Sequence, residues 1–281
     1  AFSFNTAVGY DAGVAMTTGV ENTLIGGLAG DALTTGLFNT FVGKAAGGAL
    51  TTGTYNTAIG GLALDKATTD GKNIAIGYAA LTNQIGASVD AHNIAIGYNA
   101  GLSVTTGVQN TLIGGLAGDA LTTGIENIAI GFEALSTNID GDSNVAIGVG
   151  ALKDFEADTD GHGSNVAIGN LAMHECTTGT VNTAVGARAM GNGITTGDFN
   201  VAIGYLALED VTSGNYNVAL GSQAMLQVTS GQQNVAIGYN ALASSVDGDF
   251  NTAIGYLALE DYEDGDGNGH NTAVGAQSQR N

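Results

Sequence analysis

The sequence predicts an all-β protein whose chain winds into a parallel β-solenoid of sixteen rungs, each of about 17 residues. Three observations support this prediction. A five-residue motif recurs along the whole chain, the spacing between its copies is nearly constant, and each position of the motif accepts few residue types. Glycine is frequent, at 46 residues, but proline is absent, so the composition does not fit collagen.

The motif is Asn-x-Ala-Ile-Gly, and its spacing defines the rungs. The asparagines stand at positions 5, 22, 39, 56, 73, 93, 110, 127, 144, 165, 182, 200, 217, 234, 251 and 271. Eleven of the fifteen intervals are 17 residues, and the others are 20, 21, 18 and 20. We therefore expect one continuous repeat domain over 1–281, with loop insertions near 85–92, 154–164, 191–193 and 261–270.

The columns of the motif predict one short strand per rung. The residue after each Asn is Thr, Val or Ile, the next is usually Ala, and the third is Val, Ile or Leu. This alternation has the period of a β-strand. We expect the larger aliphatic side chains to fill the interior of the coil, and the Ala side to be flat enough for another protein layer. Representative structural residues are Asn56, Ile59 and Gly60, Asn144, Ile147 and Gly148, and Asn234, Ile237 and Gly238.

Two further features follow from stacking identical rungs. The aligned asparagines are placed to form an amide ladder in which each side chain bonds the next. The glycine four residues after the Asn is present in all sixteen copies, which predicts a bend with positive φ or no space for a side chain. We also expect a second short strand from the Ala-Leu pair to the Thr-Thr-Gly turn, as in 32–36 and 49–53.

The charge and composition exclude several classes of function. The formal net charge is −20, with 26 acidic and 6 basic residues, which disfavours binding to nucleic acid or to anionic membranes. No apolar run is long enough for a transmembrane helix, so we expect no membrane insertion. The single cysteine, Cys176, is expected to be a small buried apolar residue.

The motif resembles the head repeat of YadA-like trimeric autotransporter adhesins, and the longer pattern Asn-Thr-Ala-Ile-Gly-Tyr-x-Ala-Leu resembles repeats of phage tail fibres. Copies with the adhesin signature include 144–148, 165–169 and 234–238. The resemblance covers essentially the whole chain, although the adhesin repeat is shorter, at roughly fourteen residues. It implies a left-handed β-roll and a homotrimer with the Ala side near the trimer axis.

The function that the resemblance implies is a structural or adhesive fibre segment, either an adhesin head or a tail-fibre shaft, and not an enzyme. Its location would be extracellular, on a cell surface or a virion, and its partner a host receptor or cell-surface glycan. Two alternatives stay open. The first and last motifs lie close to the ends of the sequence, which also fits a filament of solenoids stacked end to end. A hexapeptide-type acyltransferase is the other alternative, with His174 as a candidate catalytic histidine.

Three surface features carry candidate ligand chemistry. Asp264, Asp266 and Asn268 match the first half of a calcium-binding loop, although Gly275 replaces the glutamate expected at its twelfth position. Aromatic residues recur directly before the Asn and directly after the Gly, where they would stack on sugar rings or line an interface between chains. The repeated Thr-Thr pairs also raise the alternative of an ordered-water or ice-binding array.

Overall fold

The fold is a parallel β-solenoid, as the repeat predicts. The computed structural model describes residues 4–85, 90–156, 163–262 and 269–280. The chain divides into two compact units, Ala1–Asp142 and Ser143–Asn281. Each unit is built from three-residue strands, and the described residues contain no helix. The single continuous domain, the left-handed winding and the trimer stay predictions.

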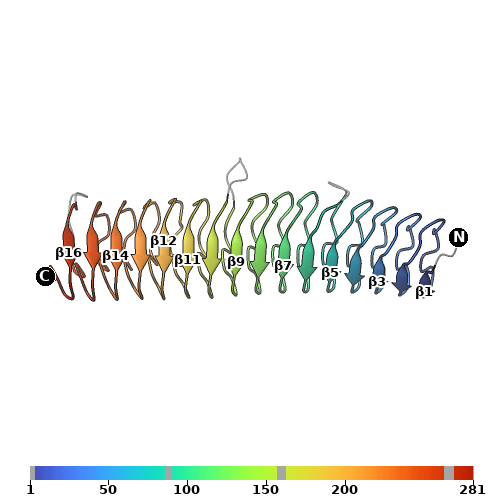
Figure 1. Cartoon of the computed structure of the whole chain (residues 1–281), viewed down its shortest axis with the longest axis horizontal. Helices are drawn as coiled ribbons and strands as arrows, with labels where there is room; N and C mark the ends of the chain where they lie inside the picture. Colours follow the sequence, from blue (N-terminus) through green and yellow to red (C-terminus); the bar gives the residue numbers. More distant parts are fainter. Residues whose placement is uncertain (1–3, 86–89, 157–162, 263–268, 281) are drawn as a thin grey trace. The chain divides into compact units, whose positions relative to one another are not determined.

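Each strand pairs in parallel with the strand of the next rung, as Figure 1 shows within each unit. The first unit contains β1 (Thr6–Val8), β2 (Thr23–Ile25), β3 (Thr40–Val42), β4 (Thr57–Ile59), β5 (Ile74–Ile76), β6 (Ile94–Ile96), β7 (Thr111–Ile113) and β8 (Ile128–Ile130). The second contains β9 (Val145–Ile147), β10 (Val166–Ile168), β11 (Thr183–Val185), β12 (Val201–Ile203), β13 (Val218–Leu220), β14 (Val235–Ile237), β15 (Thr252–Ile254) and β16 (Thr272–Val274). Equivalent residues lie side by side in neighbouring strands, as Ala58 and Ala75 do, so identical side chains form columns.

The backbone bends at both ends of every strand, which limits the strand to three residues. The residue before each repeat Asn has a positive φ, as at Tyr55 (φ 59°). The repeat glycine has a larger positive φ, 132° at Gly60. A Cβ built on Gly60 would lie 2.4 Å from the carbonyl oxygen of Gly77. The invariant glycine is thus required by both conformation and space.

The predicted second strand is wrong. Residues 32–36 and 49–53 contain turns and bends and no strand. Just before this segment, the residues six and eight after the Asn have left-handed φ angles, 60° at Leu62 and 55° at Leu64, which interrupt an extended backbone. Backbone bonds between rungs nevertheless continue along this arm, for example from the Thr34 N–H to the Thr51 carbonyl oxygen at 2.9 Å. The arm is therefore held by hydrogen bonds without being a sheet.

Replacing Gln223 by glycine is expected to raise the free energy of unfolding by about 0.5–1 kcal/mol. Gln223 has a φ of 59°, and the strain of a left-handed non-glycine residue outweighs the entropy that glycine adds to the unfolded chain. Urea denaturation followed by circular dichroism measures the change. Gln227 is the control, since its φ is not positive and glycine there should destabilise. A loss of stability in both variants would contradict the prediction.

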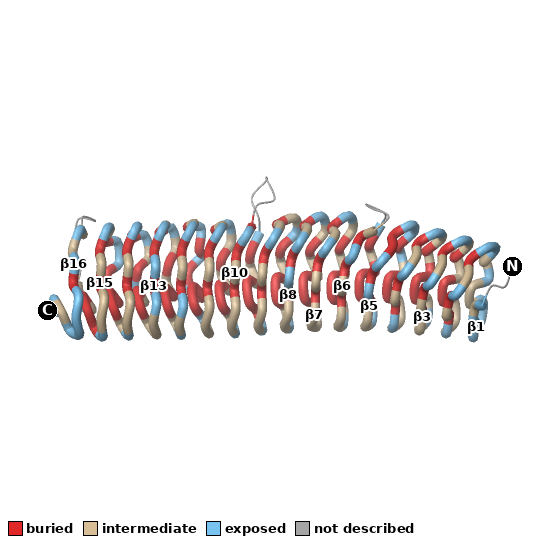
Figure 2. Tube along the Cα trace, viewed as in Figure 1, coloured by how far each residue is buried: buried red, intermediate tan, exposed pale blue. Residues whose placement is uncertain are grey.

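The interior contains the Ala column, so the predicted orientation of the strand is wrong. Ala58, Ala146 and Ala236 are fully buried, whereas Ile59 is 38% exposed. Ile147 and Ile237 are half-buried. Figure 2 shows the buried segments recurring from turn to turn within each unit. The strand therefore turns its small side chains inward and its large aliphatic side chains outward.

The narrow width of the coil explains this orientation. The Ala column lies across the interior from the column of residues eight after the Asn. Where one of these columns has a large side chain, the other has a small one. Ala58 occurs with a buried Leu64, whereas Phe41 occurs with Gly47, where a Cβ would lie 2.6 Å from the Phe41 ring. The space between the two walls therefore accepts one large side chain per rung, from either wall.

The repeat asparagines form the predicted amide ladder, which is buried inside the coil. Asn217 Oδ1 accepts hydrogen bonds from the backbone N–H of Asn234 at 3.0 Å and from its Nδ2 at 3.1 Å. Asn217 Nδ2 donates to Asn200 Oδ1 at 3.1 Å and to the Gly231 carbonyl oxygen at 2.7 Å. One side chain thus satisfies buried polar groups of three successive rungs.

Candidate functional site

The main candidate surface is the outward face of the strands, defined as the side chains one and three residues after each repeat Asn. Every residue in these two columns is Thr, Val, Ile or Leu, although the chain has a net charge of −20. Several are substantially exposed, including Ile59 in β4, Ile128 in β8, and Ile203 and Leu220 in the second unit. Exposed aliphatic columns that avoid charge are typical of a surface that packs against protein.

Aromatic columns border the strands at both ends, and their rings stack from rung to rung. In the column before the Asn, Phe38 and Tyr55 have ring centroids 5.0 Å apart and planes 6° apart. In the column after the Gly, the Tyr78 and Tyr98 centroids are 5.8 Å apart. In each stacked pair, one face of each ring is covered by the partner ring. The stacking therefore removes one face of each paired ring from the predicted stacking on sugars.

The Thr-Thr-Gly turns use part of their hydroxyl groups within the protein. The first threonine donates to the carbonyl oxygen of the next rung, from Thr34 Oγ1 to Thr51 at 3.0 Å and from Thr212 Oγ1 to Thr229 at 3.1 Å. The second threonine of the pair, such as Thr35, is exposed. The paired hydroxyl array that an ice-binding surface would need is thus reduced to single exposed columns.

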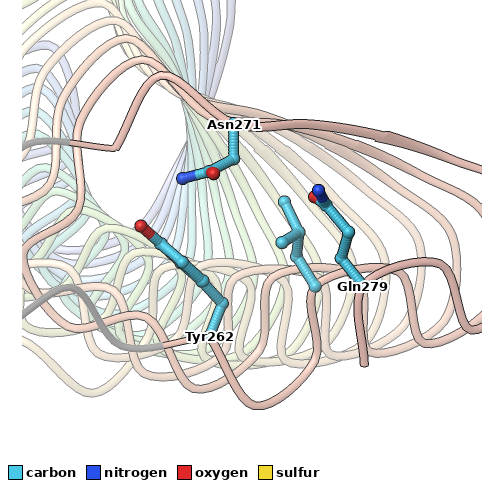
Figure 3. Close-up of a pocket in the computed structure, with 4 residues that line it drawn as sticks. Tyr262, Asn271 and Gln279 are labelled. Atoms are coloured by element: carbon cyan, nitrogen blue, oxygen red, sulfur yellow. The ribbon is translucent and has the colours of Figure 1, made fainter. Parts of the chain in front are cut away.

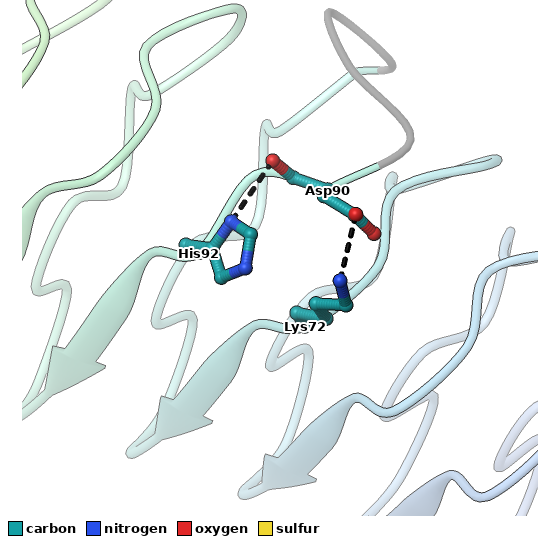
Figure 4. A network of polar contacts seen from close by, with 3 residues as sticks. All are labelled: Lys72, Asp90 and His92. Carbon is teal, nitrogen blue, oxygen red and sulfur yellow. Dashed lines mark hydrogen bonds and ion pairs between the residues drawn. The ribbon is translucent and has the colours of Figure 1, made fainter.

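An ionic contact joins two rungs beside the first insertion. Figure 4 shows Lys72, Asp90 and His92 together. The Lys72 Nζ lies 2.7 Å from Asp90 Oδ2, and His92 Nδ1 lies 3.2 Å from the Asp90 carbonyl oxygen. Asp90 also forms an isolated β-bridge with Gly71, where the chain rejoins the rungs. The charged groups are exposed, so the ion pair contributes little, at about 0–1 kcal/mol.

The carboxylates of Asp31 and Asp65 both lie beside Gly48, which has no side chain to separate them. Both carboxylates lie near the position that a Cβ on Gly48 would occupy, with Asp65 Oδ1 2.5 Å and Asp31 Oδ1 3.5 Å from it. Burial, and then the charge of Asp31, raise the pKa of Asp65 above its ordinary value, and Lys66 opposes the change. The ionised form of Asp65 is therefore disfavoured in the folded chain.

Replacing Asp65 by asparagine is expected to raise the melting temperature at neutral pH. The folded chain holds the Asp65 proton more tightly than the unfolded chain, so stability falls as pH rises above 3.8. The variant should flatten this part of the stability–pH curve, measured by thermal melts from acid to neutral pH. The exposed Asp247 is the control for loss of one negative charge. Equal gains in both variants would show that net charge, and not burial, is the cause.

The remaining acidic and histidine candidates lie apart. His174 Nδ1 is 4.0 Å from Asp154 Oδ2, a half-buried to exposed surface pair. Within the described ranges, no group of three or more His, Cys, Asp or Glu side chains could hold a metal ion. Asp264, Asp266 and Asn268, the predicted calcium ligands, lie outside the described residues, so the calcium site stays a prediction.

A small pocket in the second unit is lined by Leu259, Tyr262, Asn271 and Gln279, as Figure 3 shows. Its volume is about 200 Å³. None of its lining residues is a histidine or carries a charge, and His174 is not among them. The structure thus does not associate the candidate acyltransferase histidine with this pocket.

Among the described residues, Cys176 and Glu209 also have shifted pKa values. Burial raises the pKa of the Cys176 thiol to about 12, so the thiol stays protonated at neutral pH. Burial also raises the pKa of Glu209, although Arg188 Nη2 lies 2.9 Å from its Oε1 and opposes the change. Cys176 occupies the interior as a small apolar side chain, as its sequence context predicts.

Sequence reasoning missed a second side-chain column, two residues before the repeat Asn. Asp142 Oδ1 accepts from the Ile125 N–H at 2.7 Å, and Asp249 Oδ1 accepts from the Gln232 N–H at 2.7 Å. The available signal was Asp or Asn at this position in four rungs, at 142, 198, 215 and 249. These acids support the rungs, so part of the negative charge is structural.

Two comparisons with known proteins gave no match. No protein-family model matches the sequence, and no curated protein is detectably similar to it. Among the described residues, no helix is long and apolar enough to cross a membrane. The resemblance to adhesin and tail-fibre repeats therefore stays a prediction.

Proposed function

We propose that this chain is a structural fibre segment, an adhesin head or tail-fibre shaft, whose copies pack through the outward face of their strands. The observation that supports this proposal is the composition of that face. Its two columns contain no charged residue in any of the sixteen rungs, yet Ile59 and Leu220 are 38% and 42% exposed. A second copy of the chain has the same spacing between rungs, so its columns match this surface along their length.

The rung structure supports a mechanical role. Successive rungs are joined along the strand, along the buried Asn ladder and along the Thr column, for example by Thr51 Oγ1 donating to the Thr68 carbonyl oxygen at 2.9 Å. A pulling force must break these parallel sets of bonds together before a rung separates. The insertions leave the columns in register, as the pairing of β5 with β6 shows. Loops can therefore vary while the scaffold persists.

The proposed setting is extracellular, on a cell surface or a virion, with three copies per fibre. The number three comes from the resemblance to the adhesin repeats. Contact with a host receptor or glycan would involve the turns and insertions, because the outward face is assigned to packing between copies. The uncharged columns favour contact with protein over contact with free solvent.

The mass of the protein in solution tests this proposal. Sedimentation equilibrium should give the mass of a trimer, and the double variant Ile59→Lys/Ile203→Lys should shift it toward the monomer, because lysines buried at an interface would lack partners. Both isoleucines are partly exposed, so the circular dichroism of the variant should match the parent. The control Thr35→Lys/Thr178→Lys places the same charges on exposed turns and should stay trimeric.

A monomer at every protein concentration would overturn the proposal. Electron micrographs extend the test, because fibres much longer than one chain would indicate the end-to-end filament instead. Trimer formation that is unchanged in the Ile59→Lys/Ile203→Lys variant would show that the copies pack through another surface.

A further inference from the structure

Two tyrosine pairs are stacked on adjacent rungs. The ring centroids of Tyr78 and Tyr98 lie 5.8 Å apart with planes 13° apart, and those of Tyr239 and Tyr256 lie 5.7 Å apart with planes 16° apart. All four side chains belong to the column directly after the repeat Gly. Each ring is therefore held against its partner by the register of the solenoid.

The backbone fixes these pairs in place. The Asn99 N–H donates to the Tyr78 carbonyl oxygen at 3.0 Å, next to the first pair. The Leu257 N–H makes the equivalent bond to Tyr239, also at 3.0 Å. The four tyrosine residues are nevertheless 45–59% exposed, so a reagent in solution reaches them. The pairs combine fixed proximity with access, which is the requirement for a reaction between neighbouring side chains.

We propose that Tyr78–Tyr98 and Tyr239–Tyr256 are sites of intrachain dityrosine cross-linking by a haem peroxidase that uses hydrogen peroxide. Each phenol gives one electron and one proton to the oxidant and becomes a tyrosyl radical. The two radicals join through a carbon–carbon bond between ring positions ortho to the oxygens, and each ortho hydrogen moves to its phenol oxygen. The pair loses two hydrogen atoms in total, and one peroxide is reduced to two molecules of water.

The chain contains internal controls for this chemistry. Phe38 stacks on Tyr55 and Phe199 on Tyr216, both with centroids 5.0 Å apart. These pairs are at least as close as the tyrosine pairs, but each contains only one phenol. They have no second tyrosyl radical to combine with, so the reaction should select the tyrosine pairs by composition and not by distance alone.

The Tyr78–Tyr98 cross-link would join two rungs between which one bond of the amide ladder is redirected. Tyr78 and Tyr98 follow β5 and β6, the strands on either side of the insertion near residues 85–92. Asn73 Oδ1 accepts from the Asn93 N–H at 3.0 Å, but the Asn93 Nδ2 donates to Gln84 Oε1 at 3.2 Å, whereas Asn234 Nδ2 in the same role donates to the preceding Asn. A covalent bond between these rungs would limit their separation when the noncovalent contacts open. The inference concerns single chains and does not depend on how copies pack.

The experiment treats the full-length protein with peroxidase and hydrogen peroxide and isolates the monomer band from a denaturing gel. A protease that cleaves on the N-terminal side of aspartate places the two tyrosines of each pair on different peptides. Asp90 lies between Tyr78 and Tyr98, and Asp247 and Asp249 lie between Tyr239 and Tyr256. Mass spectrometry should find the two peptides of each pair joined, with the loss of two hydrogens. The same band should show dityrosine fluorescence.

Matched variants make the result specific. Tyr98→Phe and Tyr256→Phe keep the stacked rings, and each should remove one cross-link and leave the other. The double variant should lose dityrosine from the monomer band, whereas Tyr55→Phe/Tyr216→Phe should retain it. Protein unfolded in urea should lose the preference for these pairs.

Three results would overturn the inference. They are a monomer band without dityrosine, cross-links that occur only between chains, and fluorescence that persists in the Tyr98→Phe/Tyr256→Phe variant. A monomeric protein that still forms both intrachain links would refute the proposed packing of copies and support this inference, so the two failures are distinguishable.

Discussion

Replacing Gly60 by alanine is expected to lower the free energy of unfolding of the first unit by about 3–5 kcal/mol. Gly60 has a φ of 132°, which side chains rarely adopt, and a Cβ would lie 2.4 Å from the Gly77 carbonyl oxygen. That oxygen belongs to the backbone of the next rung, so relief requires the two rungs to separate. The change should also weaken the bond from the Gly77 N–H to the Ile59 carbonyl oxygen, now 2.8 Å.

Thermal and urea melts followed by circular dichroism measure the loss, and hydrogen exchange at the Gly77 amide localises it. Gly61→Ala is the matched control, since its nearest neighbour is the Tyr78 ring at 3.6 Å. Gly275→Ala separates the two causes, because Gly275 has a φ of 125° but nothing within 4 Å. Equal stability of the Gly60→Ala and Gly61→Ala variants would refute the account of the bend.

Replacing Asn217 by alanine is expected to cost the second unit about 3–5 kcal/mol. The change removes the acceptor for the Asn234 N–H and Nδ2 and the donor to the Gly231 carbonyl oxygen. These groups are buried, so each is left without a partner away from water. The cost exceeds that of an ordinary hydrogen bond because one amide serves several groups at once.

Urea denaturation measures the effect, and Asn170→Ala, on an exposed residue of the same unit, is the control. The variant Asn217→Asp adds a second readout. Its carboxyl can replace the amide donor only when protonated, so this variant should regain stability as the pH falls. A melt of Asn217→Ala equal to that of Asn170→Ala would show that the ladder is not a main source of stability.

The two predictions concern the same property of a solenoid. Each rung contacts only its neighbours, so a fault in one rung acts on the bonds to the next. Gly60 sets how closely two backbones approach, and Asn217 supplies the polar contacts that this approach buries. Loss of either separates adjacent rungs, by a steric clash in one case and by unsatisfied polar groups in the other.

The candidate surface was predicted only in part. The aromatic columns and the uncharged aliphatic columns are visible in the repeat, because they depend on residue type at a fixed position. The sequence predicted that Ile59 faces the interior and Ala58 faces outward, and the structure shows the reverse. The stacking of Tyr78 on Tyr98 depends on the register across an insertion, which spacing alone does not give.

The sequence by itself determined the strands, their parallel order, the bends at glycine and the Asn ladder, since each follows from the identity of a residue repeated in every rung. The tertiary structure decided which side of the strand faces inward. Alternation marks two faces, but which one is buried depends on the side chains of the opposite wall. Leu24, Phe41 and Leu112 in the Ala column were the clue, because only an interior wall with small residues opposite has room for them. Between the Ala column and the wall opposite, each rung has space for one large side chain, and this limit places the larger aliphatic side chains of the strand on the outside.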